Sequence, residues 1–169
     1  MHLIFSCSLN ENSKSNLMAR YALSLYPKDA KIIDIREMDI PFCDGDKCYD
    51  KSIVSDLKNN ILSAKSIIIA GPIYNYDLNA AAKNLIELTG RAWTDKIVGF
   101  ICAAGGKGSY MSPMSFANSL MLDFRCLIIP RFIYADGSSF NNNNLEQEIK
   151  DRIQELVETS IMLSDNIDI

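Results

Sequence analysis

Short apolar runs alternate with segments of helical periodicity along the chain, and this alternation constrains the fold more than any other feature. The apolar runs cover residues 3–5, 31–35, 66–70, 97–103 and 126–134, and we predict a strand at each. Between them, apolar residues recur at helical spacing, which predicts a helix after each strand. Strands that alternate with helices form a parallel sheet with helices on both faces, so we predict a doubly wound α/β fold.

Several residues refine this prediction. Residues 66–70 are apolar throughout, which is typical of a central strand covered on both faces. Pro130 lies inside the fifth run and is compatible only with a sheet edge or a bulge. Ser112 is expected to be the N-cap of a short helix whose first residue is Pro113. Asn144 and Gln147 resemble a capping pair for the last helix.

Length and composition limit the class of protein. The 169 residues fit one domain, 1–169, with 48% hydrophobic and 22% charged residues. The net charge of −4 argues against a nucleic-acid partner or an acidic membrane surface. No apolar run approaches the ~20 residues of a membrane span. The first strand begins at Met1, which leaves no room for a leader peptide, so we expect a cytoplasmic protein.

The sheet topology directs attention to three loops. In open α/β sheets, ligands bind beyond the carboxyl ends of the strands, where the strand order reverses. For the order 2-1-3-4-5, that crevice lies between the first and third strands. The loops at residues 6–15, 71–79 and 104–110 should converge there, and these three have unusual compositions. Their convergence is the main evidence from the residues for a binding site.

The first loop is suited to an anion. Ser8, Asn10, Ser13, Lys14 and Ser15 lie between the first strand and the first helix, where unpaired backbone N–H groups and the helix dipole favour negative charge. The glycine patterns of dinucleotide folds and P-loops are missing. A phosphate loop built from serines indicates a mononucleotide such as FMN. The alternative is that these residues are ordinary loop and capping residues.

The other two loops are suited to a flat heterocycle. Tyr74 and Tyr76, in the second loop, can present ring faces, and loop backbone groups can meet a polar edge. Gly105, Gly106 and Gly108, in the third loop, permit close backbone approach because they lack a Cβ atom. The alternative for the second loop is an ordinary loop with two partly buried tyrosines. The alternative for the third loop is a plain tight turn.

At these loops the chain resembles the NADPH-dependent FMN reductases of the flavodoxin-like fold, which include quinone, azo-dye and chromate reductases. Residues 7–15 are similar to the family pattern G-S-x-R-x-x-S-x-N, with Asn10 in place of its arginine. Residues 72–76 resemble its P-x-Y-N flavin loop, and Lys83 and Asn84 its following K-N pair. The resemblance covers nearly the whole chain.

The resemblance implies an enzyme that transfers hydride from NADPH or NADH through bound FMN to a flavin, a quinone or a similar small acceptor. Flavin carries the redox chemistry, so no catalytic side chain is expected. A homodimer or homotetramer is also implied. The implied cofactor-binding residues are Ser8, Asn10, Ser13 and Ser15, with Lys14 beside them, at the phosphate; Pro72, Ile73, Tyr74, Asn75 and Tyr76 at the ring; and Gly105, Gly106, Lys107 and Gly108 near its pyrimidine side.

Two rival functions stay open. An FMN-binding electron carrier would use the same site with a protein partner, although such carriers usually present a strongly acidic face. A flavin-free regulatory domain of the same fold would need acidic residues at the strand ends, and the first strand ends in serine.

The five cysteines are odd in number and scattered, which favours reduced thiols over a disulfide framework. Cys43 and Cys48 are too few for an iron–sulfur cluster, so we expect no bound metal.

Overall fold

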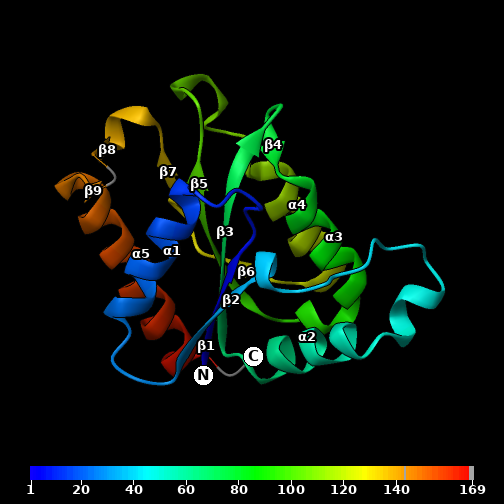
Figure 1. Cartoon of the computed structure of the whole chain (residues 1–169). Coiled ribbons are helices and arrows are strands. Elements are labelled where there is room, and N and C mark those ends of the chain that lie inside the picture. The colour runs from blue at the N-terminus through cyan, green and yellow to red at the C-terminus, as the bar shows by residue number, and fades with distance from the viewer. Residues whose placement is uncertain (143, 168–169) are drawn as a thin grey trace.

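The computed structural model describes residues 1–142 and 144–167 and has a central sheet between two layers of helices (Figure 1). The helices are α1 (Lys14–Leu25), α2 (Ser52–Ser63), α3 (Ala80–Thr89), α4 (Met114–Phe124) and α5 (Gln147–Asn166). The strands are β1 (His2–Ser6), β2 (Ala30–Asp34), β3 (Ser66–Tyr74), β4 (Asp77–Leu78), β5 (Ile97–Ala103), β6 (Leu127–Ile128), β7 (Ile133–Ala135), β8 (Phe140–Asn141) and β9 (Asn144–Leu145).

The predicted fold class is confirmed. The main sheet has the order β2-β1-β3-β5-β6, and its long strands pair in parallel. This is the predicted order 2-1-3-4-5, since β5 is the fourth predicted strand and β6 begins the fifth. Figure 1 shows α1 and α5 on one face of the sheet and α2, α3 and α4 on the other. The carboxyl ends of the parallel strands lie together at the upper edge in this view.

The core follows from strand alternation. Leu3 and Phe5 pack with α2, α3 and α4, whereas Ile4 packs with α1 and α5. Successive side chains of a strand point to opposite faces, so apolar residues at consecutive positions fill both layers at once. The predicted central strand behaves in this way, and Ile67, Ile68 and Ile69 are all buried.

The fifth strand is not the single segment that was predicted. It divides into β6, which pairs with Ile97 and Val98, and β7, which pairs with the end of β5. Pro130 and Arg131 lie in the break, and Arg131 has a φ of 59°. Proline has no N–H group to donate to a ladder, and a left-handed residue turns the chain out of the strand, so pairing resumes only at Ile133.

The second loop is shorter than the predicted range 71–79, because strand pairing continues past Gly71. β3 continues through Gly71 and Pro72, which still pair with Cys102 and Ala103 of β5. The strand then folds back on β4 in an antiparallel hairpin. Only Asn75 and Tyr76 form its loop, with φ of 50° and 66°, the sign at both central positions that a type I′ hairpin turn requires.

Helix ends differ from the predictions at three places. α1 begins at Lys14, so Lys14 and Ser15 belong to its first turn and not to the loop. α4 begins one residue after Pro113, and Ser112 caps nothing because its hydroxyl donates to the Ser109 carbonyl.

Asn144 is not a cap of α5 either. It pairs with Asn141 in the β8–β9 hairpin, and Glu146 occupies the N-cap position. The run of asparagines at residues 141–144 predicts a polar loop tip, and Asn143 of this run lies outside the described residues.

Candidate functional site

Backbone and side-chain bonds join the first and second loops at the carboxyl edge. The N–H of Cys7 donates to the Ala70 carbonyl at 2.7 Å, and Asn79 Nδ2 donates to the Cys7 carbonyl at 2.6 Å. Asn79 Oδ1 is buried and has no hydrogen-bond partner among the described residues. The junction of the two loops therefore contains an acceptor that no described protein group satisfies.

The hydroxyl groups of the first loop are used inside the protein. Ser8 Oγ accepts from the Asn10 N–H at 3.2 Å, and Ser13 Oγ accepts from the Asn16 N–H at 3.1 Å as the N-cap of α1. Ser15 Oγ lies 3.0 Å from Ser13 Oγ. Ser8 and Ser15 are almost completely buried. These serines shape the loop; Ser8 and Ser15 do so from the interior, whereas Ser13 is partly exposed.

Backbone N–H groups are the donors that this loop leaves over. No acceptor among the described residues is recorded for the N–H groups of Ser8, Leu9, Glu11, Ser13, Lys14 or Ser15. The last two belong to the first turn of α1, where the helix dipole adds positive potential. That this loop is suited to an anion stays a prediction, and the donors that the structure leaves available belong to its backbone.

Asn10 and Lys14 are less available than the sequence suggests. Asn10 Oδ1 accepts from the Asn12 N–H at 2.8 Å, so the side chain holds a local turn. Lys14 Nζ lies 4.6 Å from the centroid of the Phe140 ring, a cation–π contact with the β8–β9 hairpin.

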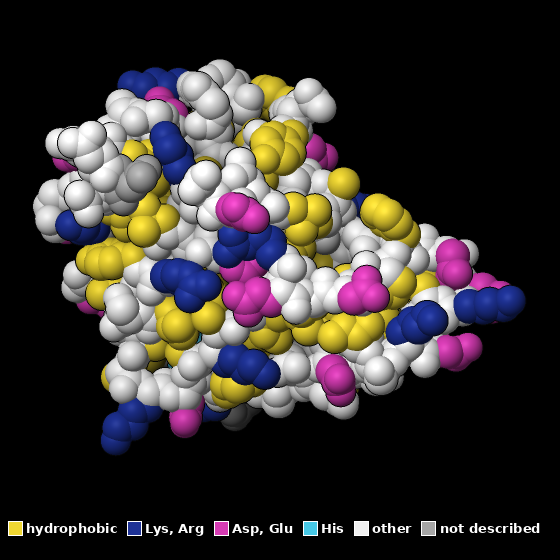
Figure 2. Space-filling model, in the orientation of Figure 1, with side chains coloured by type: hydrophobic (Ala, Val, Ile, Leu, Met, Phe, Trp, Pro, Cys, Tyr) yellow, Lys and Arg dark blue, Asp and Glu magenta, His cyan; other side chains and the backbone are white. Residues whose placement is uncertain are grey.

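A charged network beside the loop was missed by the sequence reasoning. Asp34, at the end of β2, is buried, and its carboxylate accepts from Arg36 and Asn16. Asn16 Nδ2 also donates to Ser6 Oγ at 2.7 Å, and Arg20 Nε donates to Asn16 Oδ1 at 2.9 Å. Figure 2 shows acidic and basic side chains gathered in the middle of this face, where β2 ends and the loop before α1 begins.

The electrostatics of this network are set by Arg36. Its hydrogen bonds lower the pKa of Asp34 below the ordinary value of 3.8, against the raising effect of burial. The sequence contained a signal for this pair, because Asp34 and Arg36 lie at the carboxyl end of the second strand. In the predicted order that strand lies beside the first, so its carboxyl end adjoins the first loop.

The predicted ring-binding residues divide into two groups. Pro72 and Ile73 are buried in β3, whereas Tyr74, Asn75 and Tyr76 are exposed at the hairpin tip. Tyr76 combines a φ of 66° with 57% exposure. A bulky side chain rarely adopts this backbone conformation, and such strain is concentrated at functional sites. An exposed aromatic ring held there is suited to contact a ligand.

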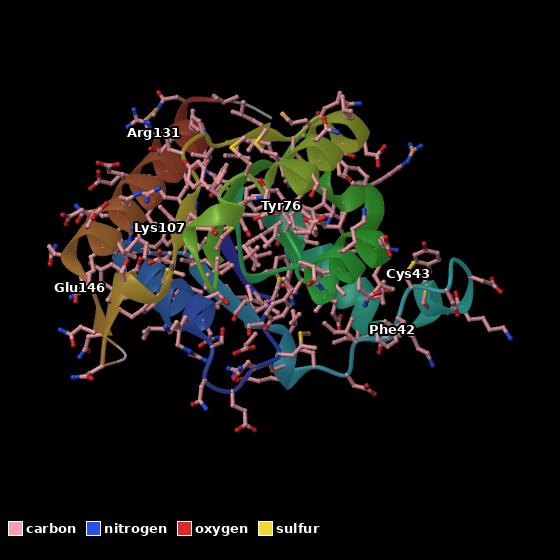
Figure 3. All side chains as sticks on the ribbon, turned by 90° about the horizontal axis from the view of Figure 1, so that it is seen from above. Phe42, Cys43, Tyr76, Lys107, Arg131 and Glu146 are labelled. Carbon is pink, nitrogen blue, oxygen red and sulfur yellow. The ribbon has the colours of Figure 1, made fainter. Side chains whose placement is uncertain are left out.

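The third loop is open but anchored. Gly105, Gly106, Lys107 and Gly108 are all exposed. The Tyr134 hydroxyl, from β7, donates to the Gly106 carbonyl. Figure 3, a view from the carboxyl edge, shows Tyr76 near the middle of the molecule and Lys107 to its left. The second and third predicted loops thus lie on the same side of the sheet.

In the K-N pair, Lys83 and Asn84, the asparagine has a structural role. Asn84, on α3, accepts from the Cys43 N–H and donates to the Pro41 carbonyl, each at 2.8 Å. It therefore fixes the arm of residues 39–51, the long segment between β2 and α2. Lys83 pairs with the exposed Glu87 of the same helix, at 3.8 Å.

The cysteines are all free thiols. Cys43 and Cys48 lie on the arm, and the described residues hold no cluster of three or more His, Cys, Asp or Glu side chains suited to a metal ion. The expectation that this chain binds no metal stays a prediction. Among the described residues, no helix has the length and apolar character needed to cross a bilayer.

Comparison with known proteins agrees with this geometry. Residues 2–140 match the family described as NADPH-dependent FMN reductase. The chain belongs to this family. Membership confirms the resemblance drawn from the loop motifs and makes the chain a flavin-dependent oxidoreductase of the NAD(P)H-using kind.

Named relatives of this FMN reductase family member are distant. An NADPH:quinone oxidoreductase from Arabidopsis thaliana is 26% identical over 167 residues, covering 90% of this chain and 85% of the relative. An NADPH azoreductase from Bacillus sp. (strain OY1-2) is 20% identical over 146 residues, covering 85% and 81%.

The structure of a flavoenzyme NAD(P)H:(acceptor) oxidoreductase from Paracoccus denitrificans superposes with a TM-score of 0.81. It is 17% identical, with 97% of this chain and 96% of that chain covered. At this identity the likeness shows the fold, which supports the flavodoxin-like prediction.

Proposed function

We propose that this chain binds FMN at the carboxyl edge of its sheet and uses NADPH or NADH to reduce a small-molecule acceptor. A flavin, a quinone or an azo compound is the class of acceptor that we expect. Support comes from the family to which the chain belongs and from the donors that its first loop leaves available.

The observation that carries this proposal is the set of unused backbone N–H groups between Ser8 and Ser15. A phosphate group needs several donors at close range, and a loop of backbone amides at a helix N-terminus supplies them without a metal. Arg36 lies against the same loop and donates to two of its carbonyl groups. The donor set therefore fits the phosphate of FMN.

The remaining loops fit a flavin ring. Tyr74 and Tyr76 offer exposed aromatic faces, and the residues from Gly105 to Gly108 leave the backbone open to close approach. When bound, FMN supplies the hydride chemistry. The role of the protein is to hold the phosphate, to orient the ring and to leave one ring face open to a second ligand.

A titration with FMN, followed by absorbance and flavin fluorescence, tests the proposal. We expect the purified chain to shift the flavin spectrum and to oxidise NADPH with a quinone as acceptor. A chain that leaves the spectrum and fluorescence of FMN unchanged would rule out the cofactor. A chain that binds FMN but does not oxidise NADPH or NADH in the steady state would instead be an electron carrier.

We also propose that the chain forms a homodimer or a homotetramer. Met114, Met121 and Leu122 on α4, together with Met111 just before it, are exposed apolar side chains close to one another in the sequence. Such a group is typical of a surface that another protein covers. Light scattering coupled to gel filtration measures the assembly, and a monomer at micromolar concentration would contradict this part of the proposal.

A further inference from the structure

Arg36 holds the buried carboxylate of Asp34 in a fixed geometry. Its Nε lies 3.0 and 3.2 Å from the two carboxylate oxygens, and its Nη2 lies 2.5 Å from Oδ2. The Asp34 side chain is only 3% exposed. A planar guanidinium that meets both oxygens of a buried carboxylate has little freedom to rotate.

The other end of the same guanidinium holds the first loop. Arg36 Nη1 donates to the carbonyl oxygens of Asn10 at 3.1 Å and of Glu11 at 3.2 Å. In a trans peptide the C=O and the following N–H point in opposite directions. Holding the Asn10 carbonyl toward Arg36 therefore directs the Glu11 N–H away from it, and this N–H is one of those without an acceptor among the described residues.

The anchor of Arg36 is itself fixed from the other side of the loop. Asn16, in the first turns of α1, donates one amide hydrogen to Asp34 and one to Ser6. The carboxylate thus joins the ends of β1 and β2 to the start of α1, and Arg36 extends this junction to the loop backbone. Every nitrogen of Arg36 is engaged with protein acceptors.

We propose that Arg36 is a positioning residue for the phosphate of FMN, and that it acts by holding the backbone of the first loop in its donor conformation. This inference rests on the proposed function. It predicts that Arg36 contributes to the preference for FMN over riboflavin, which has the same ring without the phosphate. A lysine cannot replace it, because one ammonium group cannot span the carboxylate and two carbonyls.

Three variants test the proposal, with dissociation constants for FMN and riboflavin and the unfolding temperature measured for each. Arg36→Met should weaken FMN binding by about tenfold or more, since it removes hydrogen bonds of a charged group, while riboflavin binding changes less than about twofold. Arg36→Lys keeps the charge and should remain at least about fivefold weaker for FMN than the parent chain.

Arg20→Met is the matched control. Arg20 also approaches Asp34, at 3.7 Å, and donates to Asn16, but it makes no recorded contact with the loop. We expect it to change the affinity for either flavin by less than about twofold, because the Arg20 side chain is 53% exposed and solvent screens its charge. If Arg36→Met does not fold, Arg36→Lys against Arg20→Met gives the same comparison.

Each contrary result has its own meaning. Equal losses for FMN and riboflavin in Arg36→Met would make Arg36 a general structural residue and overturn the inference. Full recovery in Arg36→Lys would mean that charge alone matters, which also overturns it. A parent chain that binds FMN while Arg36→Met binds it equally well removes this inference alone. A parent chain that binds no FMN removes the proposed function as well.

Discussion

The two ends of the candidate site are built differently. The first loop is cross-linked by hydrogen bonds of Ser8, Ser13 and Asn10 and is held from outside by Arg36. The β3–β4 hairpin ends in exposed Tyr74 and Tyr76. The first loop is therefore already ordered around its donors, so little conformational freedom is lost when an anion binds there. The hairpin keeps its aromatic rings free to adjust to a flat ligand.

The largest expected effect comes from removing the buried carboxylate that supports the first loop. Asp34→Ala leaves Arg36 and Asn16 without their acceptor, and should lower the free energy of unfolding by about 3 kcal/mol. The matched change in the hairpin is Asp77→Ala, which removes a half-exposed acceptor of Ser115 and should cost less than about 1 kcal/mol. Urea unfolding measures both, and equal losses would mean that the two ends do not differ in this way.

A smaller effect is expected from two substitutions in the first loop, one that removes a hydrogen bond and one that removes a charge. Ser13→Ala removes the N-cap of α1, so it should destabilise the chain by about 1 kcal/mol and weaken FMN binding about fivefold. Lys14→Ala removes an exposed cation that lies over Phe140, and should change FMN affinity by less than about twofold. Fluorescence titration of the two variants decides the order. A larger loss in Lys14→Ala would place the phosphate elsewhere.

In the β3–β4 hairpin, a substitution should raise stability while it lowers flavin affinity. Tyr76→Gly relieves a left-handed tyrosine, so we expect stability to rise by about 0.5–1 kcal/mol, while affinity for both FMN and riboflavin falls. Tyr74→Gly is the control. Tyr74 lies at the extended end of β3, where glycine weakens a strand, so this variant should lose stability. If Tyr76→Gly leaves both flavin affinities unchanged, the ring of Tyr76 has no part in binding.

The smallest expected effect is the dependence of stability on acid pH. The pKa of Asp34 in the folded chain lies below its ordinary value of 3.8, so the unfolded chain binds more protons as pH falls toward that value. The stabilisation is present above pH 3.8 and is lost as pH falls through the lowered pKa. Asp34→Asn should make the acid loss of stability shallower, as measured by urea unfolding at a series of pH values.

Asp44, whose pKa falls to about 2 on the exposed arm, provides the comparison for this pH series. Asp44→Asn should also make the acid loss of stability shallower. It should leave the preference for FMN over riboflavin unchanged, because the hydrogen bonds that Asp44 accepts among the described residues come from the arm. Identical acid profiles for the parent chain and Asp34→Asn would contradict the role given to Asp34.

Periodicity was sufficient to predict the alternation of strands and helices and the positions of the loops between them. Both depend on patterns that repeat along the chain, such as the all-apolar third strand, which occupies the sheet centre. Periodicity was not sufficient where a residue of capping type forms a different hydrogen bond or strand pairing. Ser112 and Asn144 both have the right residue type for an N-cap, but one completes a turn and the other a hairpin.

The details of the site depended on tertiary contacts. Ser8 and Ser15 were expected to donate to a ligand from a loop, but their burial becomes evident only when the loop packs on its neighbours. Arg36 lies 26 residues from Asn10 in the sequence and reaches its carbonyl only because β2 pairs with β1. Residue type and spacing within one loop cannot reveal a partner from another strand.

The burial of the thiols has a practical consequence. Cys7, Cys48, Cys102 and Cys126 are buried, and burial raises the pKa of Cys7 to about 12 and that of Cys126 to about 11. The thiolate is the nucleophile that attacks thiol reagents, so burial protects these side chains both by limiting access and by keeping them protonated. Cys43 is partly exposed and lies on the arm, which extends to one side of the molecule when it is viewed from the carboxyl edge (Figure 3). The folded chain can therefore be attached to a dye or an electrode through this one natural side chain, with its carboxyl edge left open to solution.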